Sequence, residues 1–229
     1  MNIASIPVAI SPFEGLYDIP SAARYLLAGR MKKEAYPVTS RTLIRWIRNG
    51  LALEDLREVP GRELLISFED LVSMRVIAAL RSAGVTWPQI HRSESWLREF
   101  TGHKRPFALE EIWSTKPAHD VYSKFSDMII ATSRSGQLAL ELMKEYLIPV
   151  SGLTFSDGVV DTWEPRSLIL LDPEVQFGAP CIEGTRIPSR AVWGMLQAGD
   201  SRALVRRAYR LREEELDAVI SWEEALAAA

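Results

Sequence analysis

Residues 40–49 carry the sequence feature that most restricts the fold, a short helical pattern with arginines on one side. At about 100° per residue, the apolar side chains gather on one face, led by Leu43 and Trp46. The opposite face is polar and carries Arg41, Thr42, Arg45, Arg48 and Asn49. Thr39 or Ser40 can cap the first turn, and Gly50 can end the helix. The pattern therefore predicts a helix that buries one face and presents arginines on the other.

The segments on either side give this basic helix a context. A short helical pattern over 19–29 comes before it, opened by Pro20. Residues 51–67 follow as two apolar arms around a Pro-Gly turn, which is a β-hairpin signal. Two longer helices are then opened by capping pairs, Ser67 with Asp70 and Thr86 with Gln89. The order of helix, basic helix, hairpin and long helix is what a winged helix-turn-helix requires.

The polar face of the basic helix suits nucleic acid. Guanidinium groups reach phosphates or guanine edges, and shorter polar side chains add contacts. An ordinary amphipathic surface helix with three arginines is the alternative interpretation. The order of the neighbouring elements favours the DNA-binding interpretation over that alternative. The predicted DNA-binding residues on the helix and the hairpin are Ser40, Arg41, Thr42, Arg45, Arg48, Asn49, Arg57 and Arg62.

Charge is distributed unevenly along the chain. The net charge of −3 alone argues against a nucleic-acid binder. Residues 1–105 nevertheless carry 15 Lys/Arg against 11 Asp/Glu, whereas the remaining residues carry 12 against 19. This asymmetry favours an anion-binding front half and an acidic rear half. Two merely solvated faces are the alternative.

From about residue 106 the pattern changes to mixed strands and helices. Residues 119–133 predict an extended segment and 136–147 a helix. Residues 153–163 predict a hairpin that turns on Asp157-Gly158. A short strand within 166–175 is followed by three helical patterns, at 189–199, 201–210 and 212–229.

Residues 178–188, GAPCIEGTRIP, contain two glycines and two prolines that turn the chain sharply twice. Gly178 and Gly184 permit backbone turns that other residues resist, and Pro188 presets the first turn of the next helix. We interpret the segment as a structural joint. Arg186 within it can form an internal ion pair, with Glu183 or Asp200 as partners, or can contact a partner protein.

No catalytic motif is found in the sequence. Cys181 has no histidine base in any recognised motif, and we expect it to be a small buried hydrophobe. The histidines His91, His103 and His119 have no i,i+4 partner, which excludes a helical metal pair. The acidic run 213–215 opens a predicted helix, where its charge complements the helix dipole. We therefore expect no enzyme activity, no metal site and no cofactor.

The sequence also bears on location. The first 15 residues have no basic region and only a short apolar run broken by proline, unlike a signal peptide. No stretch approaches the roughly 20 apolar residues of a membrane span. A cytoplasmic protein without membrane association is expected.

The front half resembles the MerR-type winged helix-turn-helix. The resembling stretches lie within residues 17–100 and read YDIPSAARYL, SRTLIRWIRNGL and GRELLISFEDLVSMRVIAALRSAGVTWPQI. The resemblance implies a reading helix over Ser40–Asn49 and a wing tip near Gly61-Arg62. One departure is the link LLAGRMKKEAYPV, which is longer than the short turn usual in that family. Another is the continuation into mixed strands, where such sensors usually have a long dimerisation helix.

Residues 168–229 resemble a small bacterial module known as domain-of-unknown-function family 433. The resembling stretches are LDPEVQFGAPCIEGTRIPSRAVW, LQAGDS and YRLREEELDAVISWEE. Together with the MerR-like half, this module is similar to one subgroup of VapB-type antitoxins. That similarity implies a protein that represses its own promoter and neutralises a PIN-domain ribonuclease toxin.

The expected fold is α+β. It consists of a MerR-like winged helix-turn-helix over 1–104, a small mixed middle over 105–165 and a three-helix module over 166–229. The expected function is that of a DNA-binding antitoxin of a type II toxin–antitoxin pair, and the resemblance implies its operator DNA and toxin as partners. Arg186 and Arg190 are the candidate toxin contacts. A homodimer is expected, because helix-turn-helix proteins usually pair half-sites.

Two other functions remain open from the sequence. One is a MerR-like transcriptional regulator that senses a small molecule through its C-terminal half. The other is an interaction protein with a degenerate winged helix. A closed apolar pocket in the rear half would favour the first, and absence of salt-dependent DNA binding would favour the second.

Overall fold

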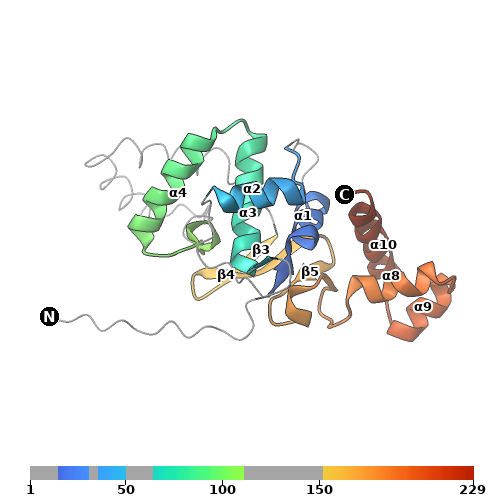
Figure 1. The fold of residues 1–229 in the computed structure, drawn as a ribbon. Helices are drawn as coiled ribbons and strands as arrows, with labels where there is room; N and C mark the ends of the chain where they lie inside the picture. Colours follow the sequence, from blue (N-terminus) through green and yellow to red (C-terminus); the bar gives the residue numbers. More distant parts are fainter. Residues whose placement is uncertain (1–14, 31–35, 50–63, 111–151) are drawn as a thin grey trace.

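The computed structural model describes residues 15–30, 36–49, 64–110 and 152–229 of the chain (Figure 1). Within these ranges the fold is mixed α+β, with seven α-helices and two small antiparallel sheets. The predicted hairpin arms up to residue 63, the extended segment 119–133 and the helix 136–147 lie outside the described residues.

The two helices of the predicted helix-turn-helix form where the capping signals place them. Helix α1 (Ile19–Ala28) begins after the N-cap Asp18, whose carboxylate accepts a hydrogen bond from the Ser21 N–H at 2.6 Å. Helix α2 (Ser40–Arg48) begins after Thr39, the N-cap among the two candidates. Its C-cap is Asn49, one residue before the expected glycine.

Two longer helices follow a short strand. Strand β1 (Tyr17–Asp18) pairs antiparallel with β2 (Leu65–Ile66). Helix α3 (Phe68–Ser82) and helix α4 (Trp87–Thr101) follow, and a 3-10 turn η1 (Pro106–Ala108) packs against both. The capping box predicted at Thr86–Gln89 is present, and Ser67 and Asp70, predicted to open α3, form a capping box as well.

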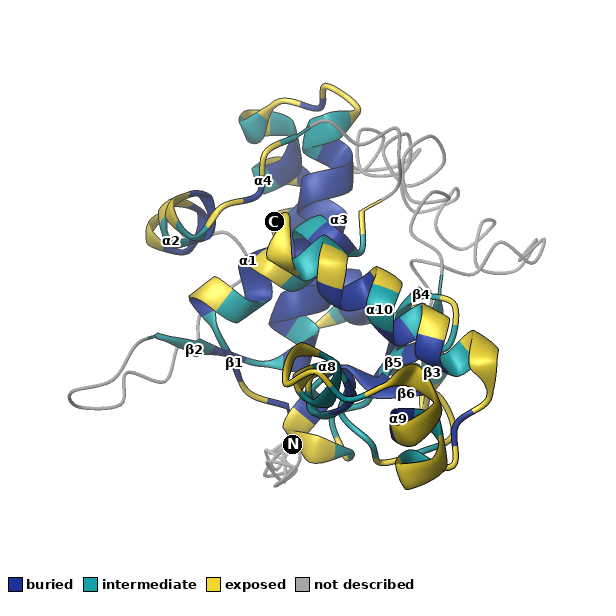
Figure 2. Cartoon of the chain, turned by 90° about the vertical axis from the view of Figure 1, so that its right-hand side faces the viewer, coloured by how far each residue is buried: buried dark blue, intermediate teal, exposed yellow. Residues whose placement is uncertain are grey.

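Helix α3 lies at the centre of the larger hydrophobic core. Its side chains from Phe68 to Leu80 are buried almost without interruption, and Figure 2 shows it dark blue along most of its length. Helices that are buried all round have little amphipathic contrast. A carboxylate within α3, Asp70, pairs with Arg105 from the η1 side. Burial raises the pKa of Asp70 in spite of the neighbouring guanidinium.

A four-stranded antiparallel sheet follows in the rear half. Its strands pair in chain order and are β3 (Leu153–Ser156), β4 (Val159–Arg166), β5 (Ile169–Leu171) and β6 (Cys181–Ile182). The β3–β4 turn has φ of 51° at Asp157 and 80° at Gly158, which confirms the predicted hairpin turn. The sheet continues across residue 166, where the sequence predicts a domain boundary.

Three helices complete the C-terminal end, as predicted. They are α8 (Ser189–Gln197), α9 (Arg202–Tyr209) and α10 (Glu213–Ala227), grouped at one end of the molecule in Figure 1. They enclose a second hydrophobic cluster centred on Val192, Val205 and Trp222, each fully buried. Pro188 is the N-cap of α8, one residue before the helix and not within its first turn as predicted.

The segment 178–188 begins at a tight contact with the N-terminal strand. Residues 176–178, the 3-10 turn η2, have φ of 52°, 56° and 84°. The Tyr17 hydroxyl donates to the Gly178 carbonyl at 3.0 Å, and the Leu16 N–H donates to the Phe177 carbonyl at 3.3 Å. The turn therefore ties the first described residues to the strand pair β5–β6, which supports its interpretation as a joint.

The two glycines of this segment predict a contrast in stability. A Cβ at Gly178 would lie 2.0 Å from the Tyr17 hydroxyl, whereas a Cβ at Gly184 meets nothing within 4 Å. Gly178→Ala should lower the free energy of unfolding by about 2–5 kcal/mol, through the clash and the left-handed backbone. Gly184→Ala should cost about 1–2 kcal/mol, because only its φ of 71° is strained. Urea unfolding of both variants measures the difference, and equal losses would contradict it.

Candidate nucleic-acid interface

Helix α2 is held in place by an aromatic cluster on its inner side. Trp46 is 1% exposed and lies between Tyr36, with ring centroids 6.0 Å apart, and Trp87, at 5.4 Å. The Arg81 guanidinium of α3 sits 5.2 Å from the Tyr36 ring and 4.9 Å from the Trp87 ring. Aromatic pairs and cation–π contacts add to the burial of apolar area. They fix α2 against α3 and α4, so the direction of its outer side is determined.

The outer side of α2 presents arginine side chains to solvent. Arg41, Arg45 and Arg48 are exposed, and Asn49 at the C-cap is exposed as well. Within the described part of the chain, none of these three arginines forms an ion pair or a side-chain hydrogen bond. We call these three residues the arginine face of α2. In Figure 2 the helix is yellow on one side and dark blue on the other.

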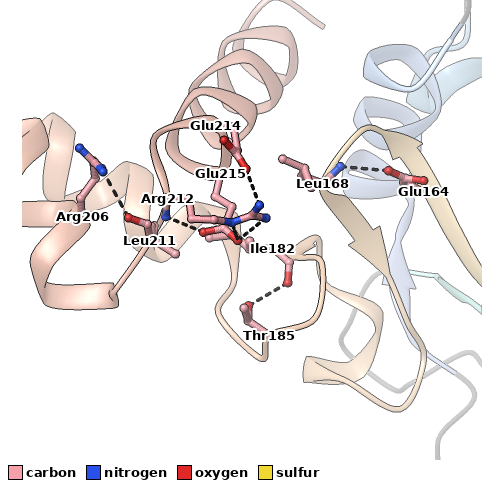
Figure 3. A network of polar contacts seen from close by, with 9 residues as sticks. All are labelled: Glu164, Leu168, Ile182, Thr185, Arg206, Leu211, Arg212, Glu214 and Glu215. Carbon is pink, nitrogen blue, oxygen red and sulfur yellow. Dashed lines mark hydrogen bonds and ion pairs between the residues drawn. The ribbon is translucent and has the colours of Figure 1, made fainter.

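Three arginines of the C-terminal helices are paired with carboxylates. Arg202 pairs with Glu213 and with Asp217, the latter at 2.6 Å, and Arg206 pairs with Glu213 at 2.5 Å. Arg212, the N-cap of α10, binds Glu214 and Glu215 (Figure 3). The acidic run 213–215 thus neutralises neighbouring arginines as well as the helix N-terminus.

Thr42 does not lie on the arginine face, contrary to the sequence-based expectation. It is 9% exposed. Its hydroxyl lies 2.9 Å from the Thr39 hydroxyl and donates to the Pro37 carbonyl at 3.3 Å. The residue belongs to the capping arrangement at the start of α2 because the chain folds back there, which helical periodicity alone does not reveal. Its hydroxyl is engaged within the protein.

The remaining predicted DNA contacts lie in two places. Ser40 is half-buried at the first position of α2. Arg57 and Arg62, assigned to the predicted hairpin, lie outside the described residues. The structure therefore groups Arg41, Arg45 and Arg48 with Asn49 and separates Thr42 from them.

The two candidate partner-contacting arginines are both exposed. Arg186 forms no ion pair with any described residue, so neither Glu183 nor Asp200 is its partner. Gln176 donates to the backbone carbonyl of Arg186 at 3.3 Å. The guanidinium itself forms no hydrogen bond with a described residue. Arg190 lies in the first turn of α8 near Glu223. Burial raises the pKa of Glu223, and the Ser189 hydroxyl and Arg190 act in the opposite direction.

Cys181 is buried and His103 is hydrogen-bonded in the described ranges. Cys181 is 3% exposed, as expected, and burial raises its thiol pKa to about 11. A neutral thiol at physiological pH is a poor nucleophile. His103 accepts a hydrogen bond from the Arg105 N–H at 3.1 Å, and His119 lies outside the described residues. Among described residues, no group of three His, Cys, Asp or Glu side chains could hold a metal ion, and no helix is long and apolar enough to cross a membrane.

The sequence analysis did not identify two arginines that contact the elements on the inner side of α2 and α1. Arg81 lies within a predicted helix, and its position between two aromatic rings depends on tertiary contacts. Arg166 ends β4 and donates hydrogen bonds to both α1 and α10. No local sequence signal identifies either role.

Comparisons with known proteins identify a domain and a fold. Residues 169–222, from β5 to within α10, match the family described as "Protein of unknown function (DUF433)". No curated protein matches significantly. The crystal structure of Rv2018 from Mycobacterium tuberculosis is similar, with a TM-score of 0.65 and 21% sequence identity. The similarity covers 89% of this chain and 96% of that one, and at this identity it extends to the fold.

The buried position of Thr42 predicts that its hydroxyl contributes to stability. Thr42→Val keeps the shape but removes the hydrogen bonds to Thr39 and Pro37, so the free energy of unfolding should fall by about 1–2 kcal/mol. Ser40→Ala is the control, since the Ser40 side chain has no hydrogen bond to a described residue, and its effect should stay within about 0.5 kcal/mol. Urea unfolding measures both. A Thr42→Val protein as stable as the wild type would argue that the hydroxyl is available for DNA.

Proposed function

We propose that this protein is a DNA-binding antitoxin that represses its own promoter and neutralises a PIN-domain ribonuclease. DNA binding is the part that the geometry supports best. The observation that carries it is the contrast between two sets of arginines. Arg202 and Arg206 of α9 and Arg212 at the start of α10 are paired with carboxylates, whereas the three arginines of α2 have no acidic partner among the described residues.

The shape of α2 also suits the proposal. The B-DNA major groove, about 12 Å wide, admits one α-helix. Helix α2 has nine residues and is anchored on one side by Trp46, which leaves its arginine face projecting outward. Arginines spaced three or four residues apart lie on one side of a helix and can contact phosphates and base edges together. In this proposal α2 is the reading helix and the segment around Arg57 and Arg62 is the wing.

A homodimer is part of the proposal. One nine-residue helix reads few base pairs, and dimers of such proteins place two reading helices about 34 Å apart on successive turns of DNA. The rear half, beyond residue 105, is proposed to bind the toxin. Support for this comes from two exposed guanidinium groups: that of Arg186 has no ion-pair partner among the described residues, and that of Arg190, in the first turn of α8, lies near Glu223.

The sharpest test of DNA binding is Arg45→Ala. Alanine keeps the helix propensity, and Arg45 is exposed, so stability should be nearly unchanged. If Arg45 reads a guanine, affinity should fall by about 1–3 kcal/mol and sequence preference should relax at one position. If it contacts phosphate alone, binding should weaken on every sequence and the salt slope should fall by about one. Gel shifts at two salt concentrations, on native and scrambled operator, distinguish the two.

The matched control for Arg45→Ala is Arg207→Ala. Arg207 is exposed on α9 and carries the same charge, so its removal changes the net charge equally. The Arg207→Ala protein should bind operator as the wild type does. Unchanged binding of Arg45→Ala under all four conditions, with unchanged melting, would remove α2 from the DNA interface.

The antitoxin part of the proposal is tested by co-expression with a PIN-domain ribonuclease encoded beside the gene. The two proteins should purify together, and light scattering should give a mass that contains two copies of this chain. The double variant Arg186→Ala/Arg190→Ala should bind the ribonuclease about 30-fold more weakly or worse, as expected when one side of a buried charge pair is removed. Full inhibition by the double variant would place the contact elsewhere, and no co-purification with the wild type would contradict the antitoxin function.

A further inference from the structure

Helix α1 is packed on two sides. One side carries Ala22, Ala23 and Leu26 into the larger core, where α1 contacts α2 and α3. The other side meets the C-terminal helices: Ala28 belongs to the second cluster, and the Tyr25 ring lies 6.2 Å from the Trp222 ring of α10. Helix α1 therefore connects the helix that bears the arginine face with the C-terminal module.

Arg166 joins α1 to α10 through hydrogen bonds of its guanidinium group. Its Nε donates to the Ala28 carbonyl, in the last turn of α1, at 3.2 Å. Its Nη1 donates to the Ser221 carbonyl at 3.3 Å and to the Ser221 hydroxyl at 3.0 Å, both on α10. The last carbonyls of a helix have no partner within the helix, so the first bond satisfies an otherwise unused acceptor. A single side chain from the end of β4 thus joins α1 to α10.

The contact between α1 and β4 leaves no free space. A Cβ built on Gly29, the C-cap of α1, would lie 2.8 Å from the Cβ of Pro165 and 2.8 Å from the Trp163 ring. Real Cβ atoms do not approach other atoms so closely, so α1 and β4 can be in contact here because residue 29 has no side chain. The end of α1 is consequently packed directly against β4.

We propose that Arg166 is a positioning residue for the arginine face, and that the C-terminal module is part of the DNA-binding unit. Arg166 holds α1 against α10, and α2 packs on α1, so the orientation of α2 depends on this junction. The inference rests on the proposed DNA-binding function and assigns to it residues that lie on the other side of α1. Any partner that displaces α10 would change DNA affinity through the same junction, and DNA would change that partner's affinity by the same factor.

The test compares full-length variants in two assays. Arg166→Ala removes all three hydrogen bonds, and Ser221→Ala removes one of them without changing charge. Operator affinity should fall by about 3- to 30-fold for Arg166→Ala and by less for Ser221→Ala. The slope of affinity against salt should stay at the wild-type value, because neither residue is proposed to touch phosphate. Amide hydrogens of α2 should exchange faster than in the wild type in both variants, with the larger increase in Arg166→Ala.

Two control variants separate positioning from charge and from general destabilisation. Arg207→Ala removes an exposed arginine without touching the junction. Val205→Ala opens a cavity at a fully buried position of α9, leaves the three Arg166 hydrogen bonds in place, and lowers the stability of the same module. Both should retain wild-type operator affinity and wild-type exchange in α2. Equal effects of Val205→Ala and Arg166→Ala would overturn the positioning role.

Hydrogen exchange also makes the test independent of the function on which it rests. If the wild-type protein binds no DNA, the proposed function fails, while faster exchange in α2 of Arg166→Ala still supports the junction. Unchanged exchange in α2, with the variant folded, overturns the positioning role whatever the DNA result. A reduced salt slope for Arg166→Ala would instead mark Arg166 as a phosphate contact and also overturn it. If Arg166→Ala does not fold, the same measurements on Ser221→Ala test the positioning role. That variant is expected to fold, since alanine is favourable in a helix.

Discussion

The burial of α1 on two sides is the constraint on which the rest of the molecule depends. Small side chains at Ala22, Ala23 and Ala28 let neighbouring elements approach it closely. Tyr25 contributes to both hydrophobic clusters, since it packs against Tyr17 as well as Trp222. A helix of ten residues has little stability of its own, so it is held by these contacts more than by its intrinsic propensity.

The positions of the acidic residues determine which arginine side chains form ion pairs within the protein and which do not. Glu213, Glu214 and Asp217 form ion pairs with Arg202, Arg206 and Arg212, and they compensate the charge of these three arginines locally. No equivalent carboxylates accompany α2 in the described ranges. The net charge of −3 consequently says little about the surface that a nucleic acid would meet. Local pairing determines the field near each helix, since charges beyond about 10 Å are largely screened at 0.1 M salt.

The sequence was informative where structure is determined by neighbours along the chain. Capping at Ser67 and Thr86, the Asp157-Gly158 turn and the three C-terminal helices form as predicted, because each depends on hydrogen bonds or backbone angles within a few residues. It was less informative where distant segments meet. Thr42 sits on the buried side because Pro37 folds back over it.

The same limit applies to the candidate site. The exposure of Arg41, Arg45 and Arg48 follows from helical periodicity, and the sequence predicted it. The bridge from Arg166 to Ala28 spans 138 residues, and the contact between Tyr17 and Gly178 spans 161. No pattern within one segment encodes such contacts, because they depend on the path of the whole chain.

The burial of the single cysteine has a practical consequence for spectroscopy. The Cys181 thiol is 3% exposed and stays protonated well above neutral pH, so it reacts slowly with thiol reagents. With no other cysteine in the chain, a thiol introduced on the solvent side of α2 would take up a fluorophore or a spin label selectively. The natural sequence thus already provides an almost silent background for distance measurements that would test the spacing of the two α2 helices in the proposed dimer.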